Sequence, residues 1–367
     1  MRPVFILLTS VLLVLVFIGN SLAADCPEGP YDVRIIDMYS DIDSGDITIY
    51  SSIGLQALSL ELQLVHDGEV LDTNTIRIDR ISPGSTVAKV FEWDTVSMSD
   101  GRYTVTGRIM QGDCQLYSWN HSFVHGRQVI PRITANDLVA NSEGASLIIM
   151  PVQPVIMDLE FMLVDGSDVI YSAREQKVAL HTQPGVIEHQ WNTLLANEKD
   201  YKARVKINMY TPAESVTLME SFTAIEDVFI SDIYRDAVGA SATIEGRSQV
   251  PFTGSLKFTV IRNSDGVVIE SVSQRSPVLL RGDDETVETI WKNRLPEGTY
   301  RLTIEVMGND GKLLDQRQTI IEAAAARRTA APANDTGNES QQAPGFTGAY
   351  LLSALIAVAL VLRIRSK

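Results

Sequence analysis

Cysteine is nearly absent from this chain of 367 residues, which contains only Cys26 and Cys114. A zinc site or a catalytic cysteine needs further cysteine or histidine partners at suitable spacing. The five histidines are scattered, and no HExxH pair occurs among them. The sequence therefore offers no zinc-ligand set and no partnered cysteine nucleophile.

Other catalytic signatures are missing as well. The chain has no G-x-S-x-G nucleophile elbow and no phosphate-binding P-loop. A carboxylate pair for glycoside hydrolysis cannot be recognised from the sequence, because its members are brought together only by the fold. We therefore expect a non-enzymatic protein and keep, as an alternative, a secreted enzyme or an accessory subunit of an enzyme acting on an extracellular polymer.

Basic residues are too few to balance the acids. The chain has 31 Lys and Arg against 46 Asp and Glu, a net charge of −15. Four of the basic residues and no acids lie in the two hydrophobic ends, so residues 25–340 carry −19. Such a surface repels polyanions and favours solubility or basic partners, which excludes nucleic acid as a partner.

The chain begins with the layout of a secretory signal peptide. Arg2 precedes an apolar stretch from Val4 to Ile18, and small residues follow, which predicts a signal peptide over 1–24 with cleavage after Ala23 or Ala24. A retained N-terminal anchor helix is the alternative. Either way, we expect the bulk of the chain to be extracytoplasmic.

Two kinds of modification follow from secretion. An even pair of cysteines predicts one disulfide, Cys26 to Cys114, worth about 4–5 kcal/mol in the chain-entropy description. N-x-Ser/Thr acceptors for glycosylation occur at Asn120, Asn334 and Asn338. Alternation in the surrounding segment points Asn120 outward, away from Trp119 and Phe123.

One unit of just under 100 residues occurs three times. Each copy has a Trp and, nine or ten residues later, a Tyr that opens an alternating run: Trp93 and Tyr103, Trp191 and Tyr201, Trp291 and Tyr300. Asp-Gly turns of the hairpin type occur in phase with them, beginning at Asp67, Asp165 and Asp265. The repetition predicts three domains of the same fold.

Apolar and polar residues alternate after each repeated Tyr, as in half-buried antiparallel strands. The predicted inward faces are 103, 105, 107 and 109, then 201, 203, 205 and 207, then 300, 302, 304 and 306. The predicted outward faces include Lys202, Arg204 and Lys206 of the middle copy. Short strands without helical periodicity indicate an all-β protein of antiparallel β-sandwiches.

The stretches "SDGRYTV" and "PEGTYRL" resemble the tyrosine corner of immunoglobulin-like and fibronectin type III domains, in which Gly-x-Tyr opens a strand. The middle copy departs from the pattern, with Lys199 in place of the glycine. The resemblance implies three tandem immunoglobulin-like sandwiches, which we place at 25–127, 128–226 and 227–323. This fold hosts adhesion, spacer and binding roles alike, so it does not select a function.

Calcium is the only cofactor for which the sequence offers candidates. Asp41, Asp43 and Asp46 supply carboxylates within six residues, but the order of ligands does not match an EF-hand loop. We interpret the stretch as a solvated hairpin turn and keep a calcium-dependent adhesin as a second alternative function. An Arg-Gly-Asp tripeptide at 281–283 is similarly interpreted as an ordinary turn.

The C-terminal part reads as a stalk over 324–343 and an apolar span with a basic end over 344–367. Pro344, Gly345 and Phe346 before that span resemble the archaeal PGF-type sorting signal, which implies cleavage by an archaeosortase-like enzyme and a lipid anchor. A plain membrane helix is the alternative. We therefore expect a protein anchored to the cell membrane and serving adhesion, envelope structure or binding of an extracellular protein or glycan.

Overall fold

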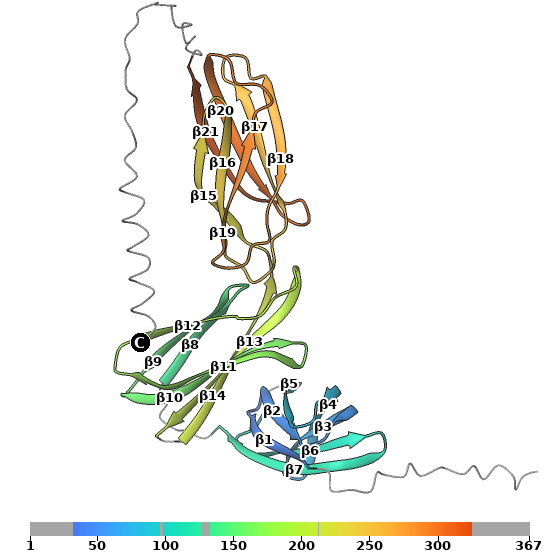
Figure 1. The fold of residues 1–367 in the computed structure, drawn as a ribbon. Coiled ribbons are helices and arrows are strands. Elements are labelled where there is room, and N and C mark those ends of the chain that lie inside the picture. Colours follow the sequence, from blue (N-terminus) through green and yellow to red (C-terminus); the bar gives the residue numbers. More distant parts are fainter. Residues whose placement is uncertain (1–31, 96–97, 127–132, 212, 325–367) are drawn as a thin grey trace, which may run out of the picture. The chain divides into compact units, whose positions relative to one another are not determined.

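The computed structural model describes residues 32–95, 98–126, 133–211 and 213–324. Within these ranges the regular structure is all β: the strands belong to antiparallel sheets, and no helix suited to crossing a bilayer is found. The strands fall into three groups, called here the first, second and third sandwich (Figure 1). The described residues up to Ala323 form one compact unit.

The first sandwich consists of seven strands in two sheets, ordered β1-β2-β5 and β4-β3-β6-β7. The strands are β1 (Val33–Ser40), β2 (Ser44–Ser51), β3 (Leu55–His66), β4 (Glu69–Ile81), β5 (Ser85–Glu92), β6 (Gly101–Gln111) and β7 (Cys114–His125). Its core includes Ile47, Leu60, Trp93 and Tyr103.

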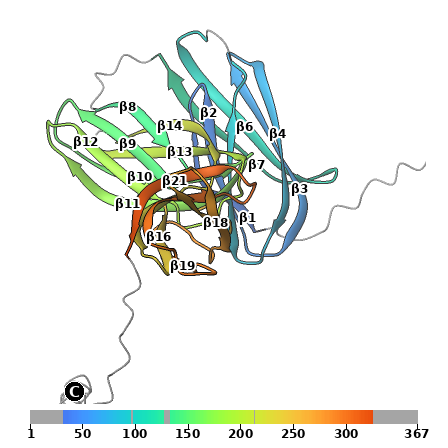
Figure 2. The same ribbon diagram turned by 90° about the horizontal axis from the view of Figure 1, so that it is seen from above.

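The second sandwich repeats this order as β12-β9-β8 and β11-β10-β13-β14. Figure 2 labels its strands in a view from above. Its strands are β8 (Ile133–Ala140), β9 (Gly144–Pro151), β10 (Val155–Asp165), β11 (Asp168–Leu180), β12 (Gly185–Gln190), β13 (Lys199–Tyr210) and β14 (Ala213–Ala224). Its core contains Leu147, Phe161 and Trp191.

The third sandwich has the orders β15-β16-β19 and β18-β17-β20-β21. Its strands are β15 (Val228–Arg235), β16 (Gly239–Gly246), β17 (Ser255–Arg262), β18 (Val268–Arg275), β19 (Asp284–Ile290), β20 (Gly298–Met307) and β21 (Leu313–Ala323). Val250, in the connection from β16 to β17, packs into the core of the second sandwich instead of the third.

The first strand of every sandwich carries the same irregularity. The pairing register shifts after Ile35 in β1, after Ala135 in β8 and after Ile230 in β15. An Asp resumes the pairing each time, at 37, 137 and 232. A bulge at equivalent positions indicates that the three copies share local geometry as well as strand order.

The predicted inward faces are confirmed in all three copies, because every member that follows the repeated Tyr is buried. The predicted outward face of the middle copy is wrong for two residues. Arg204 is fully buried and Lys206 is 3% exposed, since β13 faces the first sandwich and not water. Lys202 is half-buried.

The Tyr hydroxyls close the corners that the sequence predicts. Tyr103 donates to the Ser99 carbonyl at 2.6 Å, and Tyr300 donates to the Pro296 carbonyl at 3.0 Å. The middle copy differs: the Tyr201 hydroxyl accepts a hydrogen bond from the Ala196 N–H at 3.1 Å. This is the copy that lacks the corner glycine, so the departure in sequence accompanies a departure in geometry.

We expect Tyr103→Phe to lower the free energy of unfolding by about 1 kcal/mol, because it removes a hydrogen bond from an otherwise buried side chain. Denaturant unfolding followed by fluorescence measures the change. Tyr234→Phe is the matched control, since that hydroxyl bonds Asp236 on an exposed side chain. Equal losses of unfolding free energy for the two substitutions would show that the buried corner hydrogen bond stabilises the fold no more than the exposed one.

Several predicted features lie outside the described residues. They are the signal peptide at 1–24, Cys26, the stalk from 325 onward with Asn334 and Asn338, and the segment 344–367 with Pro344, Gly345 and Phe346.

Candidate functional site

An Asx turn joins the first two strands in every sandwich. The side-chain oxygen of Asp41 accepts hydrogen bonds from the N–H groups of Asp43 and Ser44, at 3.0 and 2.8 Å. Asn141 does the same for the amides of residues 143 and 144, and Asp236 for those of residues 238 and 239. Such side-chain caps stabilise tight turns by satisfying backbone donors.

The repeated Trp is attached to this turn. The indole N–H of Trp191 donates to the Asn141 carbonyl at 2.9 Å, and that of Trp291 donates to the Asp236 carbonyl at 3.3 Å. In the first sandwich Trp93 donates to the Ser40 hydroxyl at 3.1 Å. Each core Trp is therefore hydrogen-bonded at, or directly before, the turn between the first two strands of its sandwich.

Two of the three calcium candidates, Asp41 and Asp46, bind protein groups in this structure. Asp41 forms the turn, and its second oxygen accepts from the hydroxyls of Tyr39 and Thr217, at 3.2 and 3.0 Å. Asp46 is only 5% exposed, so the interpretation of this stretch as a solvated hairpin is wrong at that residue. Asp43 is exposed. Across the described ranges no group of three or more His, Cys, Asp or Glu is placed to hold a metal ion.

A buried cluster of charges surrounds Asp46. Its Oδ2 accepts from Nε and Nη2 of Arg204, at 3.2 and 3.1 Å, and its Oδ1 accepts from Nζ of Lys206 at 2.9 Å. Arg204 also donates to the Ser44 hydroxyl at 2.7 Å, and Lys206 to the half-exposed carboxylate of Asp37 at 2.8 Å. Two strands of the first sandwich thus meet β13 of the second through paired charges.

The cluster balances its own charge, with two carboxylates against one guanidinium and one ammonium. Burial alone would lower the pKa of Lys206, but the attraction of Asp46 and Asp37 outweighs it, and the pKa is raised. The Tyr39 ring lies 5.5 Å from the Lys206 ammonium and 5.9 Å from the Arg204 guanidinium. Burial and the Asp41 carboxylate raise the pKa of Tyr39, so its hydroxyl stays neutral.

Apolar and backbone contacts extend the same interface. Val90 of the first sandwich packs with Met162 and Val164 of the second in a small buried cluster. The Val90 N–H donates to the Ser167 carbonyl at 2.9 Å, beside an ion pair between Lys89 and Asp168. One residue pair, Asp168 with Lys89, thereby joins β11 to β5 and makes a continuous seven-stranded sheet.

The charges at this interface are specific to the first two sandwiches. Where β2 has Asp46, the equivalent strands of the second and third sandwiches have Ser146 and Ser241. Where β13 has Arg204, β6 and β20 have Thr106 and Thr303. The three copies therefore share the order of their strands, whereas the pairing of Asp46 with Arg204 has no counterpart at the equivalent described positions of the other copies.

Because Asp41 and Asp46 are occupied by protein groups, we expect EDTA to leave the melting temperature of the chain unchanged. Scanning calorimetry with and without EDTA, followed by addition of CaCl₂, measures this. A decrease that calcium reverses would contradict the expectation and favour the calcium-dependent adhesin.

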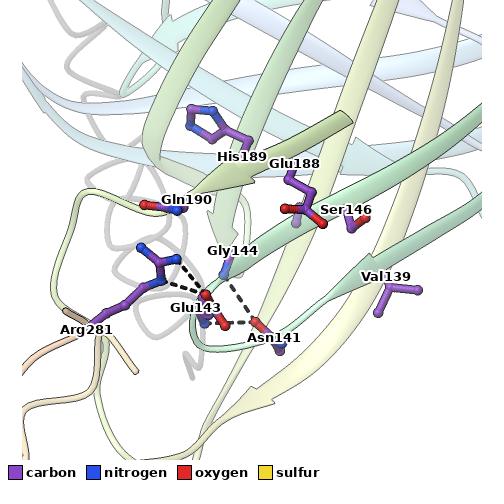
Figure 3. A pocket seen from close by; sticks show the side chains of 10 residues that line it. Val139, Asn141, Glu143, Gly144, Ser146, Glu188, His189, Gln190 and Arg281 are labelled. Carbon is purple, nitrogen blue, oxygen red and sulfur yellow. Dashed lines mark hydrogen bonds and ion pairs between the residues drawn. The ribbon is translucent and has the colours of Figure 1, made fainter. Parts of the chain in front are cut away.

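A shallow hollow of about 170 Å³ lies against the β8–β9 turn (Figure 3). Glu143 and Arg281 form an ion pair at its rim, at 2.7 Å. The His189 ring stacks on Phe161, and its Nε2 is hydrogen-bonded to the Tyr171 hydroxyl at 3.0 Å. Glu143, Arg281 and His189 are thus engaged with other protein groups, and we assign no chemistry to the hollow.

Arg281, the first residue of the Arg-Gly-Asp tripeptide, also lines this hollow. Arg281 is bound to Glu143, and the Asp283 carboxylate accepts from the Leu280 N–H at 2.9 Å. Gly282 has φ of +82°, a conformation that favours glycine. The tripeptide forms a turn whose Arg joins the third sandwich to the second.

Two of the remaining site predictions fall on described residues. Asn120 is exposed on β7 and points away from the half-buried Trp119, as the alternation predicts. Cys114 is buried at the start of the same strand. Its predicted partner Cys26 lies outside the described residues, so the pairing stays a prediction.

No protein-family model and no curated protein sequence matches this chain. Among similar solved structures, a tetra-tandem repeat from the extending region of a large adhesion protein covers 80% of this chain and 74% of its own, with 10% identity and a TM-score of 0.24. Trypsin-activated alpha-2-macroglobulin from Escherichia coli covers 82% of this chain and 24% of its own, with 11% identity and a TM-score of 0.23.

A DUF4785 family protein from Legionella pneumophila covers 80% of this chain and 92% of its own, with 9% identity and a TM-score of 0.26. At such TM-scores these similarities support no argument about function. The class that the strand order defines is an all-β protein of three repeated sandwiches.

Proposed function

We propose that this chain is a non-enzymatic cell-surface protein that presents immunoglobulin-like sandwiches for adhesion, envelope structure or partner binding. Its partner would be an extracellular protein or glycan. The observation that carries the proposal is the buried cluster of Asp46, Arg204 and Lys206. These charges bind one another across two sandwiches, which suits a chain whose domains are held together to support a binding surface.

The ends of the chain support the location in this proposal. A secretory signal at 1–24, a sequon-bearing stalk at 324–343 and the tripeptide Pro344-Gly345-Phe346 before an apolar span fit an anchored extracytoplasmic protein. In this proposal an archaeosortase-like enzyme processes the C-terminal segment, and a disulfide joins Cys26 to Cys114. The glycosylation sites of this proposal are Asn120, which is exposed, and Asn334 and Asn338 of the stalk.

Protease treatment of intact cells tests the location. We expect peptides from residues 32–323 to be released from whole cells, with mass spectrometry showing glycan mass on the peptide that contains Asn120. Release only after lysis would contradict the proposal. Mass spectrometry of the mature C-terminus adds a second result: an end near Pro344 supports processing, and a terminal Lys367 supports a retained helix.

A further inference from the structure

The connection between the second and third sandwiches is short and held from both sides. Only residues 225–227 separate β14 from β15. The Ile225 N–H donates to the Ser142 hydroxyl at 2.8 Å, and the Ile225 carbonyl accepts from the Ser248 hydroxyl at 2.7 Å. Ser142 belongs to the second sandwich and Ser248 to the third, so the connection is fastened to each.

Glu226 lies in the middle of this connection and is 5% exposed. Its N–H donates to the Asn197 side chain at 3.2 Å, and its Oε1 accepts from the Asn309 N–H at 2.8 Å. Gly308 packs against the carboxyl group so closely that a Cβ there would lie 2.4 Å from Oε1. The residue therefore joins the loop before β13 to the loop before β21.

The second carboxyl oxygen of Glu226, Oε2, is buried and has no hydrogen-bond partner among the described residues. Three charged groups act on Glu226: Asp310 and Lys312 from the loop before β21, and Glu198 from the loop before β13. The Lys312 ammonium is shared between Asp310 and Glu198, at 2.7 and 2.6 Å. The only cation of the set is therefore already paired with two other acids.

These surroundings favour the neutral form of the acid. Burial raises the pKa of Glu226, Asp310 and Glu198 add to the rise, and the Asn309 amide and Lys312 only partly oppose it. A neutral carboxyl still accepts the Asn309 hydrogen bond through Oε1. An ionised one places a negative charge on an oxygen that no described donor reaches.

We propose that Glu226 is a proton-operated latch between the second and third sandwiches: neutral Glu226 closes the junction, and ionised Glu226 weakens it. A carboxyl whose pKa is higher in the closed junction contributes stability that is fully present below its unfolded pKa of about 4.3 and is lost as pH rises through the closed-state value. Between those two values the equilibrium for opening shifts about tenfold toward the open form per pH unit.

Hydrogen exchange of the full chain in mild detergent tests the latch. The readout is protection of the Glu226 and Asn309 amides between pH 4.5 and pH 8, after correction for the intrinsic pH dependence of exchange. We expect wild type to lose protection by up to about tenfold per pH unit in part of this range. E226Q should stay protected throughout, because its side chain is neutral and keeps an oxygen for the Asn309 amide.

Glu297→Gln is the matched control, since Glu297 is exposed in the loop between β19 and β20. We expect it to follow wild type. Protection in wild type that does not change with pH, or an E226Q variant with the pH dependence of wild type, would overturn the proposal.

A second measurement keeps the test valid if E226Q does not fold. The infrared band of a protonated carboxylic acid in wild type should disappear with the same midpoint as the loss of protection. A midpoint that differs by more than about one pH unit, equivalent to about 1.4 kcal/mol, would show that another group controls the junction.

Discussion

Arg204→Ala is expected to lower the free energy of unfolding by about 3–5 kcal/mol, among the largest effects of any single substitution in this chain. Asp46 would remain buried, and its Oδ2 would lose both hydrogen bonds from the guanidinium. Only the hydrogen bond from Lys206 to Oδ1 would remain. Removing one partner of a buried pair costs far more than the pair contributes net, because the remaining charge stays out of water. Urea unfolding followed by tryptophan fluorescence measures the change.

Arg108→Ala provides the comparison. Arg108 pairs with Glu61 at 3.6 Å on the exposed face of β6, where an ion pair contributes less than about 1 kcal/mol. We also expect Arg204→Ala to separate unfolding of the first sandwich from that of the second, because their shared interface is weakened. A loss below about 1 kcal/mol for Arg204→Ala would mean that water reaches the cluster in solution.

Trp191→Ala is expected to cost about 3–5 kcal/mol, through the loss of a large core side chain and the cavity left behind. Trp191 is 1% exposed in the core of the second sandwich. Its indole N–H also bonds the carbonyl of Asn141, which caps the β8–β9 turn, so the substitution removes a donor from that turn. Calorimetry or denaturant unfolding of the full chain measures the loss.

Leu194→Ala is the control for this substitution, because Leu194 lies three residues away and is 61% exposed. Its effect should stay within about 0.5 kcal/mol. Trp191→Phe should fall between the two, since it keeps part of the apolar volume without the donor. Equal losses of unfolding free energy for Trp191→Ala and Leu194→Ala would contradict the expectation that burial of Trp191 stabilises the second sandwich.

Local patterns predicted the architecture well. Alternation after Tyr103, Tyr201 and Tyr300 identified the buried faces, because the side chains of a strand point to opposite sides whatever surrounds it. The Asp-Gly turns marked the hairpins between long strands, since their backbone suits the twist of the pair. The Asx turn is harder to predict from the sequence, because the first copy has Ser44 where the others have Gly144 and Gly239.

The interface could not be predicted in the same way. A charged strand face has the same alternation whether it meets water or an oppositely charged face, so Arg204 and Lys206 looked like solvent-facing residues. The available signal was comparative: the middle copy has three basic residues on one strand face, and Asp37 and Asp46 lie on adjacent strands of the first copy. Connecting the two requires knowing which sandwich contacts which.

A double-mutant cycle between Asp46 and Arg204 tests the central claim most directly, namely that buried charges join the first two sandwiches. The substitutions Asp46→Ser and Arg204→Thr give these positions the residues found at the equivalent positions of the third sandwich. We expect a coupling of about 1–3 kcal/mol, because each single change leaves a buried charge that the double change removes. Additive effects, with a coupling below about 0.5 kcal/mol, would contradict the account.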